Sequence, residues 1–451
     1  MARVTRPGNA VTEKIDEAMV LLRQARRLAL DPDPEPPDPP DPEPPDPADW
    51  IQVAAGTALQ PVINDAPVGA VLALAPGTYM GSLTLPKAIT IRPSGEVPNG
   101  RATAAGTGVV IVGFAGEDTF TVTGDGVTLL GITATTPDAK RQIVSFTGTN
   151  LCLDRCTLRG DALVGAHRGV MLNGAGATIV DCHIDRIFDI GRDTQAISGW
   201  DGTRDVLIDN CYLEGAGETV MFGGADSTAP DRIPTNIRIT NSTLTKDPSW
   251  FSKGVQIKNA LELKACVGFE MTECLLEYGG TSEGQGGYLI LFSIRNQDGT
   301  APWTTVQHVH VWDCHARYGG GGIKFLGRDD GQESIPMTDV VVENVLISDL
   351  DPRGVTGGDG RGLCFLGGPD AVTIENVTIE GQNLGTSMYL IPPPYPTNMV
   401  LRNIKLPPSD YGMKIDGGGS GPAAWQAAMP DAVIELTPED TGSTYPSAAG
   451  A

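Results

Sequence analysis

Charged residues interrupt a family of otherwise apolar segments, and these residues have the side chains with which the chain could do chemistry. Glu218, Glu262 and Lys264 lie within such segments. Two carboxyl groups about 5–9.5 Å apart can hydrolyse a glycosidic bond. Lys264 or Arg295 could instead act as the base of a β-elimination, if a neighbouring cation lowered its pKa. The competing interpretation is that these charges only form a solvated outer face.

Acidic residues also follow the same segments, in the turns where each segment ends. If the segments stack in register, the turns form a stripe that covers roughly 15–20 Å over four strands. Asp298 is a candidate for a further catalytic carboxylate, and Asp298, Asp329 and Asp330 are candidate ligands for Ca²⁺, which prefers oxygen. The alternative is that the Asp-Gly pairs only close turns. The stripe consists of Asp201, Asp226, Asp298, Asp329, Asp330 and Asp370, with Arg295 and Arg328 beside it.

Three tryptophans fall in the loops beside these polar turns: Trp200, Trp250 and Trp303. A flat apolar ring can stack on the C–H face of a sugar while its N–H finds a polar partner. We therefore expect a substrate-binding side made of these rings with Asp201, Asp226 and Arg328. The alternative is that the rings fill contacts between the loops and the body.

A recurring eight-residue phrase determines where all these residues must lie. Two of its ten copies are ATIVDCHI from 177 and VTIENVTI from 372, and successive copies are 24 to 40 residues apart. Apolar residues alternate on both sides of a polar fifth position, which predicts two short strands around a tight bend. The segments that carry Glu218 and Glu262 lie between the phrases and supply a third strand. Three strands per repeat and about ten repeats predict an all-β protein, a right-handed parallel β-helix.

The fifth and sixth positions of the phrase support this prediction. The fifth is often Asn or Asp, as at Asn210 and Asn241, and these residues tolerate a left-handed backbone. The sixth is small, and five of the eight cysteines occupy it. Stacking would place one such side chain above the next inside the solenoid. We expect the cysteines to be free, buried thiols.

Composition divides the chain into four parts. Residues 1–30 carry six basic and three acidic side chains and an apolar stripe, which predicts a short helix for attachment or oligomerisation, or else a frayed tail. Residues 31–49 hold ten prolines and eight acids, which predicts an extended spacer on the order of 60 Å long. Residues 50–406 form the β-helix with its N-terminal cap. Residues 407–451 form a C-terminal cap and tail.

Charge and hydropathy exclude several functions. The 451 residues include 32 Lys and Arg but 55 Asp and Glu, for a net charge of -23. Such a chain is a poor ligand for nucleic acid or for an anionic membrane surface, since both need a basic face. No run of 18 apolar residues predicts a membrane span. The N-terminus lacks the apolar core of a secretory signal, so we expect synthesis in the cytoplasm.

Residues 50–406 resemble the pectate-lyase-like parallel β-helix superfamily. The opening IQVAAGTALQPVINDAPVGAVLALAPGTYMGSLTLPKAITIRPSG is similar to the N-terminal cap of that superfamily, and the asparagines at 210, 241, 344 and 376 are similar to its asparagine ladder. The superfamily contains polysaccharide lyases, glycoside hydrolases, esterases and phage tailspikes. The resemblance therefore implies a polysaccharide as partner but does not choose a reaction.

The order of the parts also resembles virion-attached spikes and decoration proteins of phages. That layout implies a virion-associated protein, or one released from the cell by lysis, which docks on other virion proteins through residues 1–30 and forms a homotrimer. Three hypotheses follow. The first is a virion protein that binds, and in one version cleaves, a cell-surface polysaccharide. The second is a non-catalytic decoration protein. The third is a free bacterial polysaccharide lyase or glycoside hydrolase.

Overall fold

The computed structural model describes residues 47–281 and 286–436. The expected attachment helix of residues 1–30, nearly all of the 31–49 spacer and the end of the 407–451 tail lie outside the described residues. A short 3-10 helix, η1 (Pro47–Asp49), ends the first part of the chain. The chain from Trp50 onward is a unit of its own, and it is described here by itself as the body.

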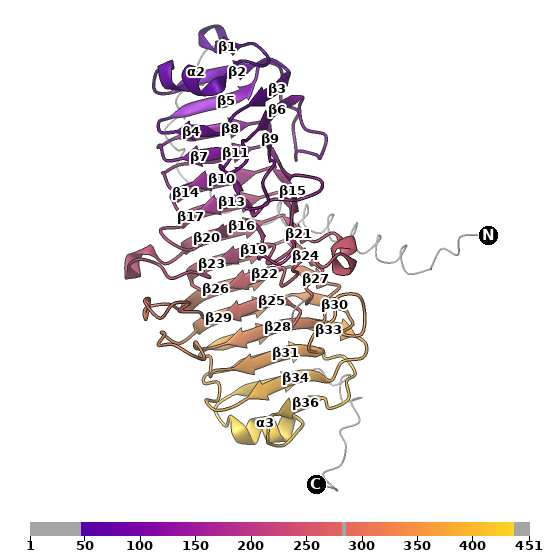
Figure 1. Ribbon diagram of the computed structural model, residues 1–451. Coiled ribbons are helices and arrows are strands. Elements are labelled where there is room, and N and C mark those ends of the chain that lie inside the picture. Colours follow the sequence, from indigo (N-terminus) through magenta and orange to yellow (C-terminus); the bar gives the residue numbers. More distant parts are fainter. Residues whose placement is uncertain (1–46, 282–285, 437–451) are drawn as a thin grey trace, which may run out of the picture. The chain divides into compact units, whose positions relative to one another are not determined.

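The body consists of three long parallel sheets, which Figure 1 shows stacked coil upon coil. Each coil contributes one strand to each sheet in turn, so a strand pairs with strands about one repeat away rather than with its sequence neighbours. In one example, Ile208 pairs with Ile239 and Ile239 pairs with Met271. The predicted all-β, right-handed parallel β-helix is confirmed.

Sheet A contains the first strand of each phrase. Its fourteen strands are, in order, β1 (Ile51–Val53), β2 (Ala70–Leu74), β5 (Ile89–Pro93), β8 (Val127–Leu130), β11 (Cys152–Asp154), β14 (Ala175–Val180), β17 (Arg204–Asp209), β20 (Thr235–Thr240), β23 (Cys266–Thr272), β26 (Val306–Trp312), β29 (Thr338–Glu343), β32 (Val372–Glu375), β35 (Val400–Ile404) and β37 (Val433–Leu436).

Sheet B contains the second strand of each phrase. Its eleven strands are β3 (Gly77–Met80), β6 (Val109–Val112), β9 (Thr133–Thr136), β12 (Thr157–Gly160), β15 (His183–Ile187), β18 (Tyr212–Gly215), β21 (Thr243–Thr245), β24 (Leu275–Glu277), β27 (His315–Arg317), β30 (Leu346–Leu350) and β33 (Thr378–Gly381).

Sheet C contains the segments between the phrases. Its twelve strands are β4 (Leu83–Leu85), β7 (Phe120–Val122), β10 (Gln142–Phe146), β13 (Arg168–Leu172), β16 (Gln195–Gly199), β19 (Val220–Phe222), β22 (Leu261–Leu263), β25 (Tyr288–Ser293), β28 (Gly321–Leu326), β31 (Arg361–Leu366), β34 (Thr386–Ile391) and β36 (Met413–Ile415).

The bend between sheets A and B is made by one left-handed residue in each coil, as the phrase predicts. Asn210 has φ 48° and Asn241 has φ 51°. The amide of Asn210 donates to Oδ1 of Asp181 in the previous coil, and the amide of Asn241 donates to Oδ1 of Asp209. These bonds link one bend to the next. Short polar side chains can hold this conformation because they bond locally.

The residues after these bends form the predicted internal ladder. Cys156, Cys182, Cys211 and Cys274 are fully buried, with Ser242 in line between the last two. The eight cysteines are all free and seven of them are buried, as predicted, whereas Cys152 in β11 is partly exposed. Each coil also has a second left-handed bend, before sheet A, that the sequence analysis missed. There the amide of Asn236 donates to Oδ1 of Asp205, and both residues have positive φ.

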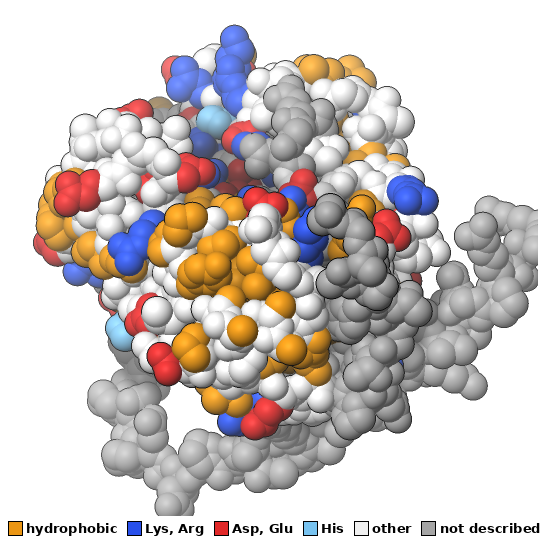
Figure 2. Space-filling view, turned by 90° about the horizontal axis from the view of Figure 1, so that it is seen from below, with side chains coloured by type: hydrophobic (Ala, Val, Ile, Leu, Met, Phe, Trp, Pro, Cys, Tyr) orange, Lys and Arg blue, Asp and Glu red, His pale blue; other side chains and the backbone are white. Residues whose placement is uncertain are grey.

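Short helices lie at both ends of the solenoid (Figure 1). Helix α2 (Leu59–Asp65) covers the first coils. Helix α3 (Pro422–Ala428) lies at the other end, and its buried Trp425 meets Phe365 of the core edge to face. Seen from this end, hydrophobic side chains gather over the end of the solenoid (Figure 2).

Two 3-10 helices lie in loops, η2 (Pro230–Arg232) and η3 (Pro248–Ser252). No helix among the described residues has the length and apolar character that a membrane crossing requires.

Candidate functional site

Three of the five predicted catalytic residues come together on sheet C. Glu218 precedes β19, Glu262 lies in β22 and Lys264 follows β22. The two strands are neighbours, with Met221 opposite Glu262. Both carboxyl groups are withdrawn from water, since Glu218 is 0% and Glu262 3% exposed. A fold in which a charged pair is buried this deeply needs compensating partners.

Glu218 is held by a neutral donor on one side and by two cations on the other. The amide Nε2 of Gln195 donates to its Oε2 at 2.8 Å. The ammonium groups of Lys258 and Lys264 lie 3.5 and 3.6 Å from its Oε1. No hydrogen bond reaches that Oε1 atom from the described residues. Oε1 of Glu218 is therefore a buried acceptor with two positive charges close by but with no hydrogen-bond donor.

Glu262 shares one of these cations. Its Oε1 lies 3.6 Å from the ammonium of Lys264, and its Oε2 accepts from the amide of Asn259 at 2.9 Å. An oxygen of each carboxylate is thus 3.6 Å from the same nitrogen, so the two oxygens are at most twice that distance apart. Glycosidase carboxyl pairs work at separations of about 5–9.5 Å, and this arrangement is compatible with that range.

The surroundings shift the pKa values of the two carboxyl groups in opposite directions. Burial raises the pKa of Glu218, but the nearby Lys264 and Lys258 ammonium groups outweigh burial and lower it to about 2. Burial and the charge of Glu218 raise the pKa of Glu262 to about 7, against the opposite effect of Lys264. Two carboxyl groups with separated pKa values provide an acid and a base in one place.

Lys264 does not meet the condition set for a catalytic base. Burial lowers its pKa, but the negative charges of Glu262 and Glu218 outweigh burial and raise it. No net lowering occurs, so the ammonium keeps its proton and has no lone pair to offer. Lys264 is therefore placed to hold two carboxylates together rather than to abstract a proton.

Several members of this cluster were missed by the sequence analysis. Arg168 donates from Nε to Oε1 of Gln195 at 3.0 Å, and Lys258 is paired with Asp193 at 2.5 Å. Gln195 itself interrupts an apolar segment in the sequence, as Glu218 and Glu262 do, and Arg168 lies opposite it in β13 and β16. Alignment of the strand starts could therefore have found Arg168. Asp193 and Lys258 come from loops, where spacing carries no such information.

A fully buried lysine, Lys246, bonds to the backbone segments next to the cluster. The ammonium of Lys246 donates to the carbonyl oxygens of Gly215, Gly217 and Asn259 and to Oγ1 of Thr219, at 2.7–3.0 Å. Burial lowers its pKa to about 7, although the charge of Glu218 acts in the opposite direction. Lys246 ties together the chain before β19 and the chain before β22. No sequence pattern distinguished it.

Glu262 belongs to a row of side chains that crosses sheet C. Successive pairings place Ser198, Met221, Glu262, Leu291 and Lys324 side by side on neighbouring strands. The first four are buried and Lys324 is partly exposed. Beyond Lys324 the row continues through Cys364 and the partly exposed Tyr389. Cys364 is fully buried, so Lys324 and Tyr389 are the accessible members of this part of the row.

The predicted stripe of acids in the turns is a set of loop contacts at the other ends of these strands. Asp201 forms an ion pair with Arg232 at 2.8 Å. Oδ2 of Asp226 accepts from the backbone of Asp298 and from Thr300, which joins two loops. The side chain of Asp298 is exposed. The structure therefore does not bring Asp298 to Glu218 and Glu262.

Arg295, Asp329 and Asp330 form a group that adjoins the cluster, since the backbone N–H of Arg295 donates to the carbonyl oxygen of Lys264 at 3.0 Å. The guanidinium of Arg295 is paired with both acids, and Asp329 also accepts from the backbone N–H of Asn296. Among residues 47–281 and 286–436, no three His, Cys, Asp or Glu side chains are arranged to hold a metal ion. The residues present thus do not fit the predicted Ca²⁺ site with Asp298. Calcium stays a prediction that a calcium titration would test.

The three tryptophans lie in different surroundings. The guanidinium of Arg168 lies 5.1 Å from the centre of the Trp200 ring, which places Trp200 beside the cluster. Trp303 donates to Oγ of Ser227 and joins the loops around Asp226. Trp250 is 3% exposed and packs on Phe188, with ring centres 5.3 Å apart. Arg328 is exposed.

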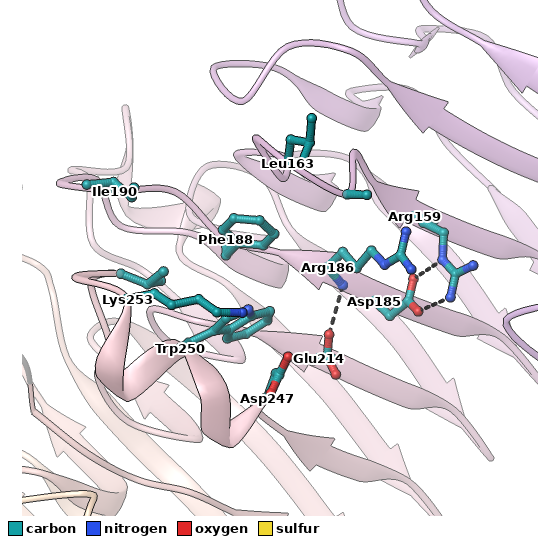
Figure 3. Close-up of a pocket in the computed structure, with 12 residues that line it drawn as sticks. Arg159, Leu163, Asp185, Arg186, Phe188, Ile190, Glu214, Asp247, Trp250 and Lys253 are labelled. Atoms are coloured by element: carbon teal, nitrogen blue, oxygen red, sulfur yellow. Dashed lines mark hydrogen bonds and ion pairs between the residues drawn. The ribbon is translucent and has the colours of Figure 1, made fainter.

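A cavity of about 390 Å³ opens on the sheet B side, beneath Trp250 and Phe188 (Figure 3). Its walls come from β12, β15 and β18, from the loop after β15 and from the loop with η3. Of the residues that line this cavity, only Trp250 was predicted from the sequence to lie in a binding site. The lining residues are Arg159, Ala162, Leu163, Asp185, Arg186, Phe188, Ile190, Glu214, Asp247, Trp250, Lys253 and Val255.

Comparisons with known proteins identify the fold. No family model matches the chain, and no characterised protein matches its sequence. The catalytic domain of a GH87 α-1,3-glucanase in complex with tetrasaccharides is similar in structure, with a TM-score of 0.55 and 13% identity over 89% of this chain and 70% of that one.

Two further solved structures are more distant. An alginate lyase from Paenibacillus sp. str. FPU-7 matches with a TM-score of 0.43 and 16% identity, over 74% of this chain and 98% of that one. A tailspike protein from the Acinetobacter baumannii bacteriophage Fri1, a capsular polysaccharide depolymerase, matches with a TM-score of 0.33 and 12% identity, over 85% and 54%. The body of the present chain has the right-handed parallel β-helix fold.

Proposed function

We propose that the body binds a polysaccharide along the outer face of sheet C and hydrolyses it at the cluster of Glu218 and Glu262. The observation that carries the proposal is the pair of buried carboxyl groups around one ammonium, with pKa values shifted in opposite directions. A purely structural ion pair needs no carboxyl group that is still protonated near neutral pH. A general acid does need one.

In this proposal Glu262 is the general acid. Its neutral carboxyl group donates a proton to the glycosidic oxygen as the bond to the leaving sugar breaks. The ionised Glu218 stabilises the positive charge that develops on the other sugar, and it directs a water molecule or forms the bond itself. Lys264 keeps Glu218 ionised and fixes the distance between the two carboxyl groups. Water supplies the hydroxyl of the new reducing end.

The partly exposed Lys324 and Tyr389, which follow the buried Glu262 in the row, support a polymer that lies across the strands. Neighbouring strands are roughly 4.8 Å apart, so four coils cover the length of a few sugar rings. Trp200 lies on the other side of the cluster and could stack on a sugar. The similar α-1,3-glucanase was solved with tetrasaccharides, and we extend the substrate class of polysaccharides to this chain.

Reducing-end release from a panel of bacterial capsular and plant acidic polysaccharides tests this function. We expect release by the full chain and none by Glu262→Gln, whose amide can still accept from Asn259. Glu270→Gln is the matched control, since Glu270 is an exposed glutamate on sheet A. Products that absorb as unsaturated uronates would instead show a lyase. No release from any member would favour the non-catalytic decoration protein.

We further propose that residues 1–30 attach the protein to a larger particle, a phage virion, with residues 31–49 as spacer. The basic, apolar-striped segment and the ten prolines with eight acids support this layout. The protein would then leave the cell by lysis, and a homotrimer is expected. Light scattering of the full chain and of a chain lacking residues 1–30 tests the assembly. A monomer in both would contradict the trimer.

A further inference from the structure

The cavity on the sheet B side has two chemically different ends (Figure 3). At one end the Phe188 ring and Trp250 lie together, and Ile190 stands at the rim with 71% of its side chain exposed. Leu163, at 88%, is another exposed apolar residue on the rim. Large exposed aliphatic side chains that gather around one cavity indicate a surface that contacts an apolar face of a ligand.

The other end is polar and carries both basic and acidic side chains. The guanidinium of Arg159 forms a two-bonded pair with the carboxylate of Asp185. Figure 3 shows the side chain of Arg186 extending toward this pair. Among the described residues no ion pair or side-chain hydrogen bond engages the Arg186 guanidinium. The carboxylates of Asp185 and Glu214 lie at this end as well, but Asp185 is bonded to Arg159 and Glu214 accepts from the Arg186 backbone, so the Arg186 guanidinium is left for a ligand to meet.

The backbone is shaped to present Arg186 there. The pairing of β15 with β18 shifts register between Ile184 and Ile187, and Arg186 lies in this bulge with φ 58°. Oε1 of Glu214 accepts a hydrogen bond from its backbone N–H at 3.0 Å. Bulges re-aim side chains, and a left-handed arginine is an uncommon conformation that its surroundings must hold in place.

We infer that this cavity is a second carbohydrate-binding site, which takes one acidic sugar unit of a polysaccharide. The Phe188 ring provides a platform for the C–H face of the sugar, and Arg186 pairs with its carboxylate. The volume of about 390 Å³ is in the lower range of small-molecule sites and suits a sugar or a short piece of glycan. This inference goes beyond the proposed function, because it requires no bond cleavage.

The test uses the full chain with methyl β-D-glucuronide as probe and neutral methyl β-D-glucoside for comparison. Binding is followed by saturation-transfer NMR and calorimetry. We expect saturable binding of the glucuronide, weakened about tenfold or more by Arg186→Gln, with the glucoside unaffected by that change. Arg186→Lys should recover part of the affinity. Phe188→Ala should weaken both sugars.

Two control variants separate this site from the rest of the molecule. Lys140→Gln removes an exposed cation elsewhere and should leave binding unchanged, as should Glu270→Gln on sheet A. Loss of glucuronide binding in Glu270→Gln, equal effects of Arg186→Gln and Lys140→Gln, or no saturable binding would each overturn the inference. Thermal unfolding of each variant shows that the fold is kept. The outcome does not depend on whether the protein cleaves a polysaccharide.

Discussion

Glu218 and Glu262 share one ammonium, because an oxygen of each carboxyl group lies 3.6 Å from Nζ of Lys264. The two residues sit on neighbouring coils that are far apart in the chain. Their closeness therefore depends on the register of β19 and β22. The two carboxyl groups are unequal because Glu218 has Lys258 and Gln195 as further partners, which keep it ionised, and its charge then raises the pKa of Glu262.

Glu262→Gln should lower the rate of polysaccharide cleavage by about 10²- to 10⁴-fold, because it removes the proton that leaves with the departing sugar. The fold should be kept, because the side chain is neutral in both proteins below pH 7. Rates of reducing-end release by the variant, the parent and Glu270→Gln provide the measurement. Equal rates in all three would remove Glu262 from the mechanism.

The rate of cleavage should fall as the pH rises above 7. The general acid must be protonated, and the raised pKa of Glu262 is about 7, so the rate should decline about tenfold per pH unit beyond it. Toward low pH the rate should persist well below pH 4.5, since the lowered pKa of Glu218 keeps its carboxylate ionised. A rate profile from pH 3 to 9 tests both limbs, and a rate that rises between pH 7 and 9 would contradict the assignment.

Lys246→Met should destabilise the body by about 3 kcal/mol, because buried acceptors around the ammonium lose their donor. The change also removes a positive charge near Glu218. Urea unfolding followed by circular dichroism measures the effect. Lys140→Met, at an exposed position, is the matched control. Unfolding midpoints that shift equally in both variants would show that the buried ammonium of Lys246 stabilises the fold no more than an exposed lysine does.

Asn241→Ala should cost about 1–2 kcal/mol, since alanine disfavours the left-handed backbone and cannot donate to Asp209. Asn241→Gly should cost less, because glycine accepts the same φ without strain. Comparison of the two unfolding midpoints separates the backbone effect from the hydrogen bond. A glycine variant less stable than the alanine variant would show that the bend does not need this conformation.

The fold could be predicted because the core repeats. The coils share an alternating strand, a left-handed residue at the bend and a buried residue after it. Pairs such as Asn210 with Cys211, and Asn241 with Ser242, therefore repeat one pattern along the chain. The candidate site occurs once. Glu218 and Glu262 were found because each interrupts an apolar strand, but no periodic signal pointed to Lys246 or to Lys258, which come from loops.

The stripe of acids shows why a pattern can mislead about contacts. Asp201 and Asp226 do recur at corresponding turns, but their partners are Arg232 and Thr300, which lie in loops of irregular length. The cavity beside Phe188 was missed for a related reason. It depends on a bulge at Arg186 and on two loops, and neither feature alters the alternation of apolar residues.

The coil is also a natural unit of evolutionary change. Each coil has the same three strands and two bends, so a whole coil can be duplicated or lost without a change in the pattern of its neighbours. Residues such as Glu262 and Lys324 lie on the outer row and not in the core, and the loops between coils vary in length. A lineage of such proteins could therefore exchange one glycan for another by altering the outside of a few coils, while the stacked interior stays as it is.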